Sequence, residues 1–407
     1  MEAVVQDVVI VGAGIAGLTT SLGLHRLGVR SLVLESSESL RTTGFALAIW
    51  TNAWRALDAV GVSDSLRQLH TKTKGIITSS TVTGLPTSER SFNANHEVRC
   101  VKRKLLLEAL ARELPSGTIR YSSKVVCIEE TGYLKLVHLA DGTVIKSKVL
   151  IGSEGVNSVV ANWLDFKKPP FDGRAVIRGC AEFKSSHGFE PKLMQFFGNG
   201  IRCGCIPCDD YSVYFFFTFV RSSQDKEVEE NPAKMKEFIL SKLGKSDDHM
   251  RVTVEKTELD SIMCSPLRFR PPWQLLWGNI SKGNVCVAGD ALHPMTPDIG
   301  QGGCAALEDG IVLARCLAEA LLQKPAVASK EKPEKEEFRR IEMGLKKYAQ
   351  QRRWRSFELI ATASLFGCIQ QSNGPVMRFL REKVLAVFLS WLLLKRASFD
   401  CGQLSKS

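Results

Sequence analysis

Apolar and polar residues at the start of the chain alternate as a strand, a turn, a helix and a second strand. Residues Asp7 to Val11 form an almost wholly apolar run, which is typical of a buried parallel strand. After a Gly-rich turn, apolar residues recur at helical spacing from Leu18 to Leu27. Leu32 to Leu34 is a second apolar run, and it ends at Glu35. The pattern predicts a complete βαβ unit in about 30 residues.

Similar α/β patterning continues to about residue 168 and returns late in the chain. Helical spacing predicts helices over Ala53–Leu69 and Lys102–Leu114, and strands are expected within Ile119–His138 and at Val149–Gly152. After residue 272, the apolar run Val285–Ala288 predicts another buried strand. A long Gly-rich turn and a helix from about residue 303 to 323 follow it. We therefore expect residues 1–168 and 273–325 to form one discontinuous α/β domain.

The pattern differs in the middle and at the end of the chain. From about Pro169 to Pro272, alternating and aromatic runs predict a mostly antiparallel sheet, which we assign to a substrate domain of residues 169–272. Residues 324–337 are charged and contain two prolines, as expected of a solvated loop. Helices are predicted over Phe338–Ala363 and Pro375–Leu394, so residues 326–407 form a charged loop and C-terminal helices.

Composition indicates a soluble globular protein with a basic end. Of the 407 residues, 44% are hydrophobic and 24% are charged, and the net charge is +11. Most of the excess lies between Lys330 and Ser407, where 16 Lys and Arg face 8 Asp and Glu. A positive charge favours anionic partners. Nucleic acid is not expected, because no basic-aromatic motif is present.

The cysteines indicate neither a disulfide framework nor a metal site. Twelve are spread through a long chain, and the cluster of Cys203, Cys205 and Cys208 lacks a second pair at zinc-like spacing. We expect core thiols and no metal. The first strand begins near Asp7, which leaves no room for a signal or transit peptide and predicts a cytoplasmic location.

An apolar run near the C-terminus allows two interpretations. Val384 to Leu394 is apolar except for Ser390 and is bounded by basic residues. As a helix it would reach only about 16 Å, short of the roughly 30 Å of a bilayer core. It is therefore either a packed helix end that covers the nucleotide-binding domain or a basic helix that makes a peripheral membrane contact.

The Gly-rich turn after the first strand has the spacing of a dinucleotide-binding motif. It follows a strand, opens a helix, and has an acid, Glu35, 18 residues beyond its last glycine. The first glycine allows the tight turn, the second allows the backbone to approach a pyrophosphate, and the third allows the helix to pack on the strand. The helix N-terminus faces the phosphates. The motif consists of Gly12, Ala13, Gly14, Ile15, Ala16 and Gly17.

A second motif favours FAD over NAD. The strand ending at Ala288 is followed by Gly289 and Asp290, and then by a turn with Pro297, Gly300, Gln301 and Gly302. A carboxylate at a strand end binds a ribityl hydroxyl. A Gly-rich turn that enters a helix offers N–H groups to a phosphate or to the flavin carbonyls. A nicotinamide enzyme has no use for a second site of this kind.

Residues 5 to 360 resemble the class A flavoprotein monooxygenases, the salicylate-hydroxylase-like and zeaxanthin-epoxidase-like group, and most of all its plant branch. The resemblance implies a Rossmann-like FAD-binding domain of the glutathione-reductase type with an inserted β-sheet substrate domain. It implies that the Gly-rich motif and Glu35 hold the ADP half of FAD and that Asp290 holds the ribityl chain. Pro297, Gly300, Gln301 and Gly302 would lie along the isoalloxazine and pyrophosphate side. Arg103 matches an arginine that reaches FAD, or is a solvated helix charge, and Arg41 is a weaker candidate of the same kind.

A third motif departs from the family pattern. Family members carry Asp-Gly in a stretch that serves FAD and NAD(P)H, whereas this chain has Glu154 and Gly155, with Ala161 where many members have arginine. The extra methylene would displace the carboxylate by more than ~1 Å, which matters at a tightly fitted site. The alternative function is therefore a flavoprotein of the same fold with weakened NAD(P)H use, as a reductase or a ligand-binding protein.

The resemblance also implies the reaction. NADPH or NADH reduces FAD, which reacts with O2, and the C4a-hydroperoxyflavin passes one oxygen atom to a small apolar or aromatic substrate. The cofactor carries this chemistry, so no catalytic side chain is assigned, and His293 is expected to be structural. The aromatic run of the middle sheet is expected to line the substrate pocket, with about half of its side chains facing away. It comprises Phe196, Phe197, Tyr214, Phe215, Phe216 and Phe217.

Overall fold

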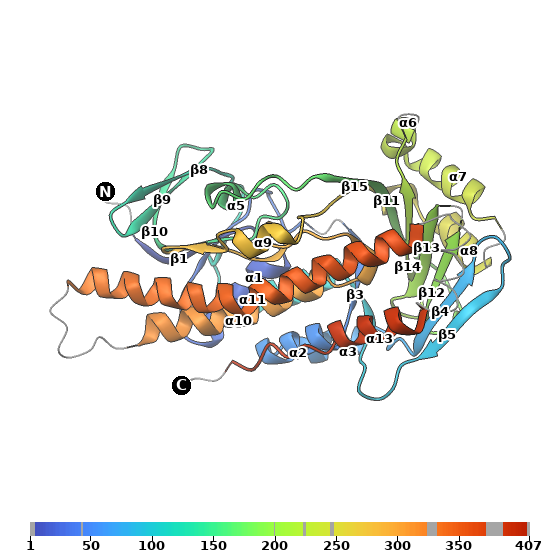
Figure 1. The fold of residues 1–407 in the computed structure, drawn as a ribbon, viewed down its shortest axis with the longest axis horizontal. Helices are drawn as coiled ribbons and strands as arrows, with labels where there is room; N and C mark the ends of the chain where they lie inside the picture. Colours follow the sequence, from blue (N-terminus) through green and yellow to red (C-terminus); the bar gives the residue numbers. More distant parts are fainter. Residues whose placement is uncertain are drawn as a thin grey trace.

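The computed structural model describes residues 5–41, 44–198, 200–222, 225–244, 248–323, 332–371 and 386–404. Two sheets lie toward opposite ends of an elongated molecule, and the long helices α10 and α11 run between the two ends (Figure 1). The predicted mixed α/β fold, with a mostly antiparallel second sheet, is confirmed. Among the described helices, none is both long enough and apolar enough to cross a bilayer.

The first sheet has eight strands, ordered β16-β17-β10-β1-β2-β7, with β9 paired to β10 and β8 to β9. Its parallel core brings Val11 level with Gly152, and Gly152 level with Val287. Because the carboxyl ends of parallel strands share one edge, the three predicted motifs meet there. The strands are β1 (Gln6–Val11), β2 (Leu32–Leu34), β7 (Ile119–Arg120), β8 (Val125–Thr131), β9 (Leu134–Leu139), β10 (Val144–Gly152), β16 (Ser281–Lys282) and β17 (Val285–Val287).

The second sheet has seven strands, ordered β15-β11-β14-β13-β12-β4-β5, and only the β12–β4 pair is parallel. The strands are β4 (Gly75–Ser80), β5 (Pro86–Ser91), β11 (Phe171–Glu182), β12 (Lys192–Gly198), β13 (Ile201–Pro207), β14 (Ser212–Val220) and β15 (Ile262–Arg268). Two of them, β4 and β5, come from the stretch that we assigned to the first domain. The remaining strands, β3 (Ala46–Ile49) and β6 (Arg99–Lys102), pair with each other in a separate two-stranded sheet. The domain boundaries themselves stay a prediction.

Helices cover both sheets. The outer face of the second sheet packs on α7 (Pro232–Lys242) and α8 (Asp248–Lys256), beside α6 (Lys226–Glu230). The remaining helices are α1 (Ile15–Arg26), α2 (Thr51–Val60), α3 (Ser63–Leu69), α4 (Arg103–Arg112), α5 (Val159–Trp163), α9 (Trp273–Trp277), α10 (Gly302–Leu322), α11 (Pro333–Gln371) and α13 (Ala386–Arg396), with 3-10 turns at Leu259–Ser261, Gly289–Ala291 and Pro297–Ile299. Helices α1 and α10 pack closely because Gly23 has no side chain: a Cβ there would lie 2.7 Å from that of Ala314.

Two helix predictions need correction, and a third lies partly outside the described residues. The single helix expected over 53–69 is two helices, because Gly61 takes a left-handed conformation (φ 77°) that ends α2. The helix expected over 338–363 extends from Pro333 to Gln371. Of the predicted C-terminal helix, residues 375–385 lie outside the described part of the chain, and the rest is α13, which packs against the body of the protein through Leu392 and Leu393. That packing favours the first interpretation of this segment, and membrane contact stays a prediction.

Candidate functional site

A cavity of about 520 Å³ lies between the two sheets, and all three predicted motifs line it. Its nucleotide side includes Gly12, Ala13, Gly14, Ile15, Ala16, Glu35, Arg41, Arg103, Glu154, Gly155, Asp290, Pro297, Gly300 and Gly302. The inner face of the second sheet forms the opposite side, with Val176, Arg178, Leu193, Gln195, Arg202, Ile206, Tyr214, Phe216 and Met263. Of the predicted site residues, Gly17 and Gln301 are not in this lining.

The Gly-rich turn is shaped for close approach of a ligand to the backbone. Gly12 has φ 99°, and a Cβ there would lie 2.8 Å from Cα of Glu154. A Cβ on Gly17 would lie 2.0 Å from the carbonyl oxygen of Gly12, so Gly17 acts through packing. At Gly14 a Cβ would meet only the carbonyl oxygen of Ser153, at 3.9 Å, and Gly14 precedes α1 without any side-chain cap. The free N–H groups of the helix N-terminus therefore face the cavity, as a phosphate requires.

Glu35 is held as a charged acceptor at the end of β2. It is 3% exposed and accepts hydrogen bonds from the N–H groups of Ala13 (2.9 Å) and Ser37 (2.9 Å). Arg41 lies 3.4 Å from its carboxylate. Burial alone would raise the pKa of Glu35, but the hydrogen bonds and Arg41 lower it overall. A charged carboxylate at this position suits the hydroxyls of a ribose.

Arg103 and Asp290 form the charged part of the cavity wall. Burial lowers the pKa of Arg103 and raises that of Asp290, and each opposes the shift of the other. Asp290 is accessible and lines the cavity. Arg103 therefore belongs to the site rather than to a solvated helix face.

Glu154 serves a local structural role as well as lining the cavity. Its Oε1 accepts from the N–H of Val160, 3.0 Å away in the first turn of α5. Its Oε2 is buried without a hydrogen-bond partner among the described residues, and burial raises the pKa of the carboxyl. Gly155 beside it has φ 87°, while Ala161 is buried in α5 outside the lining. One carboxylate oxygen of Glu154 is thus left for a ligand.

The turn before α10 contains a glycine in a left-handed conformation. Gly300 has φ 61°, and a Cβ there would lie 3.3 Å from Nε1 of Trp50. Helix α10 then begins at Gly302 without a side-chain cap. Gln301 points its side chain away and accepts a hydrogen bond from Nδ2 of Asn52 at 2.9 Å. His293 is fully buried against Asp309 (2.6 Å) and is not part of the lining.

Strand alternation divides the aromatic run between two faces. Tyr214 and Phe216 line the cavity, whereas Phe215 and Phe217 belong to the core under α7 and α8. Phe196 packs in that same core. Three of the six side chains, Phe196, Phe215 and Phe217, face away, so the prediction of about half is confirmed. Only Tyr214 and Phe216 line the cavity.

Several polar residues of the cavity were not predicted. Six lining residues, of which only Arg103 and Glu154 were predicted, carry a buried polar atom without a partner in the described part of the chain: Trp50 Nε1, Arg103 Nε, Glu154 Oε2, Arg178 Nε, Arg202 Nε and Thr296 Oγ1. Buried polar atoms normally have partners, so this set fits a large polar ligand such as FAD. The described residues contain no group of three or more side chains suited to a metal, and Cys203, Cys205 and Cys208 are buried thiols.

Comparisons with known proteins agree with this geometry. Residues 5–329 match a family model described as an FAD binding domain. The chain is 54% identical to Monooxygenase 2 of Arabidopsis thaliana over 98% of both chains, and 36% identical to Monooxygenase 1 of that plant over 98% and 99%. Its fold is similar to that of Klebsiella pneumoniae HpxO, solved with FAD and uric acid, with a TM-score of 0.80, 20% identity and 98% coverage of each chain. The chain therefore belongs to the class A FAD-dependent monooxygenases.

Proposed function

We propose that this enzyme accepts a hydride from NADPH or NADH and inserts one oxygen atom from O2 into a small aromatic substrate. The observation that carries the proposal is a single cavity that joins the nucleotide-binding motifs to an aromatic sheet face. Bound FAD supplies hydride acceptance and oxygen activation. The Gly-rich turn, Glu35, Arg103 and Asp290 would bind and orient it, and residues 297–302 would contribute to the binding of its flavin part.

The second sheet supports a substrate with an acidic or hydrogen-bond-accepting group. Arg178 pairs across the second sheet with Phe216 and Met263, two apolar lining residues, and Tyr214 lies within its electrostatic range. Arg178 makes one long hydrogen bond, 3.4 Å to Ser265, and forms no ion pair within the described residues. A guanidinium in such a wall recognises a phenolate or carboxylate strongly, because water does not compete there.

Glu154 supports a second candidate, a flavoprotein with weakened NAD(P)H use. Its carboxylate already accepts from α5, and its raised pKa favours a neutral side chain. Both features weaken the binding of NAD(P)H by this carboxylate. This candidate keeps FAD binding and predicts slow flavin reduction.

One experiment separates the two. The purified protein is mixed anaerobically with NADPH and then with NADH, and flavin absorbance is followed by stopped flow, with the Glu154→Asp variant as the matched comparison. Rapid bleaching of the wild type, followed by incorporation of isotopically labelled O2 into an added aromatic acid, is the result expected of the monooxygenase. A wild type that stays yellow while Glu154→Asp bleaches would establish the second candidate. A protein that cannot take up FAD would refute both.

A further inference from the structure

We propose that Leu393, in the C-terminal helix α13, is a specificity-determining residue of the oxygenation site and sets the size of substrate that the cavity accepts. The proposal rests on the proposed function above. Leu393 lines the cavity although it lies far along the chain from every predicted motif. It packs with Met295 and Ile299, two further lining residues that flank Pro297. It therefore forms the wall at the turn that we assign to the flavin ring.

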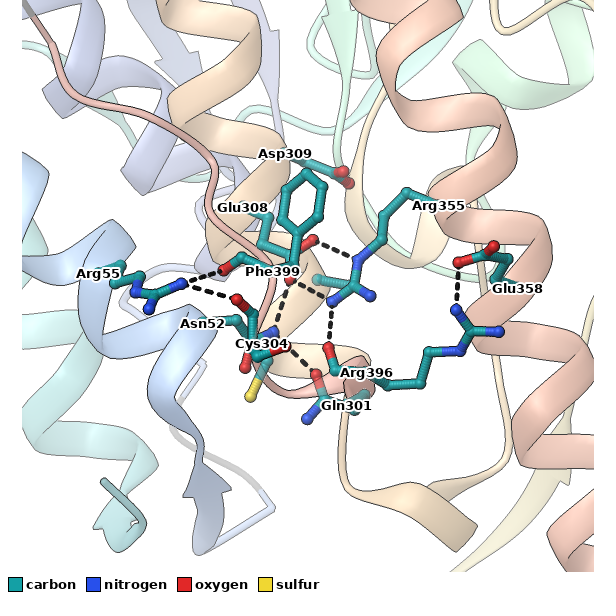
Figure 2. Close-up of polar contacts among 12 residues, drawn as sticks. Asn52, Arg55, Gln301, Cys304, Glu308, Asp309, Arg355, Glu358, Arg396 and Phe399 are labelled. Carbon is teal, nitrogen blue, oxygen red and sulfur yellow. Dashed lines mark hydrogen bonds and ion pairs between the residues drawn. The ribbon is translucent and has the colours of Figure 1, made fainter. Parts of the chain in front are cut away.

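The segment that carries Leu393 is fixed by contacts immediately after it. The N–H of Asn52 donates to the carbonyl of Ala397 at 3.0 Å. Arg355 donates to the carbonyl of Arg396 at 2.7 Å and stacks over the ring of Phe399, 4.6 Å from its centroid. Figure 2 shows Arg355 between Glu308 and this main chain. A wall residue held by backbone contacts on adjacent residues keeps a defined position.

The same contacts connect the wall formed by Leu393 to the turn before α10 (residues 297–302), called here the cofactor turn. Glu308 is fully buried and accepts from Arg355 (2.6 Å) and from Nδ2 of Asn52 (2.6 Å). Asn52 also donates to Gln301 in the turn before α10. The side chain of Gln301, which does not line the cavity, thus has a structural use (Figure 2). Buried charged hydrogen bonds hold α13 and the cofactor turn in one geometry.

Helix α13 also offers a matched control. Leu392 is the preceding residue, is likewise partly buried, and packs on the cluster around Ile299, but it does not line the cavity. Leu392→Ala removes the same atoms from the same helix. Any effect shared by the two alanine variants reflects helix packing, and only the difference reports on the cavity.

The test uses full-length, FAD-loaded protein and two readouts. The first is quenching of bound-flavin fluorescence by iodide, which requires neither NAD(P)H nor substrate. The second is the ratio of dissociation constants for 2-naphthoate and benzoate, measured from the flavin absorbance change. We expect Leu393→Ala to increase quenching and to lower the naphthoate-to-benzoate ratio about tenfold, the scale of a methylene-sized change in an apolar pocket. Leu393→Trp is expected to shift both readouts in the opposite direction, and Leu392→Ala neither.

The outcomes are decisive without a known substrate. Quenching and ratio that stay at wild-type values in Leu393→Ala, or that change equally in Leu392→Ala, overturn the proposal. If neither acid binds any variant, the iodide result alone decides. A wild type that binds FAD but never oxygenates a substrate would refute the proposed function while leaving the quenching test intact.

Discussion

Neutralising the buried carboxylate of Glu308 should destabilise the folded protein. It has no exposed surface and accepts hydrogen bonds from Asn52, Arg352 and Arg355. Burial would raise the pKa of its carboxyl, yet the two guanidinium groups lower it overall, so Glu308 is charged. Glu308→Gln keeps the shape but leaves the buried Arg352 and Arg355 with less negative charge beside them. Figure 2 shows Arg355 beside Glu308.

The magnitude follows from the contacts that remain. Removing one partner of a buried ion pair costs about 3–5 kcal/mol. Arg352 keeps Asp309 at 2.5 Å, and Arg355 keeps the carbonyl of Arg396 and the ring of Phe399, which places the estimate at the lower end of that range. With an unfolding entropy of about 2.1 cal/mol/K per residue, ~3 kcal/mol lowers Tm by about 4 °C in a chain of 407 residues.

The assay is thermal unfolding of the FAD-loaded protein, followed by far-UV circular dichroism. Glu319→Gln is the control, because Glu319 lies on the same helix and pairs with Lys347 where both side chains are more than half exposed (57% and 51%). An exposed pair is worth less than about 1 kcal/mol, or about 1 °C in this chain. Equal shifts in the two variants would refute the reasoning that burial makes the Glu308 network stabilising.

Substitutions at three further positions test separate parts of the site. Gly17→Ala places a Cβ 2.0 Å from the carbonyl oxygen of Gly12, so the purified protein should lose most of its FAD, measured by the ratio of flavin to protein absorbance; full occupancy would contradict the packing role. The raised pKa of Glu154 means that burial penalises its charged form, a penalty absent below its ordinary value of 4.5 and present above its folded pKa. Glu154→Gln should therefore raise Tm of the FAD-free protein at pH 8, with a gain that shrinks as the pH falls toward 4.5; a gain independent of pH would refute the assignment. Arg178→Met should weaken benzoate binding by at least about tenfold, and Arg178→Lys by less, in flavin absorbance titrations, and equal losses would argue against charge recognition.

The sequence predicted the nucleotide side of the site because its geometry is local. Each motif directly follows a buried apolar strand, and parallel strands bring their carboxyl ends to one edge whatever the rest of the fold does. The glycines at 12 and 17 were predictable from the motif, although the contacts that exclude a side chain there come partly from Ser153 and Glu154, which follow the neighbouring parallel strand β10. The standing of the individual residues as FAD ligands remains a prediction.

The substrate side was less predictable because it depends on long-range pairing. Strand β5, Pro86–Ser91, is exposed at every position and carries no hydrophobic signal, yet it is hydrogen-bonded to β4. Alternation predicted that half of the aromatic run faces the cavity, but only the register shows that Phe216 lies opposite Arg178. Leu393 is one leucine in an apolar run, and nothing in the run distinguishes it from Leu392.

Buried carboxylates connect the turns around the cavity to distant elements. Asp298 lies in the turn before α10 and accepts from Arg174 and Arg202 of the second sheet, at 2.9 Å and 3.3 Å. Asp309 accepts from the N–H of Gly289 at 2.7 Å, next to Asp290. Together with Glu308, these groups hold the cofactor turns, the substrate sheet and the C-terminal wall in one arrangement. In a site where the cofactor carries the chemistry, such groups act by fixing distances. Their loss should therefore first cause NAD(P)H to be oxidised without oxygen insertion into the substrate, and only then slow the reduction of the flavin.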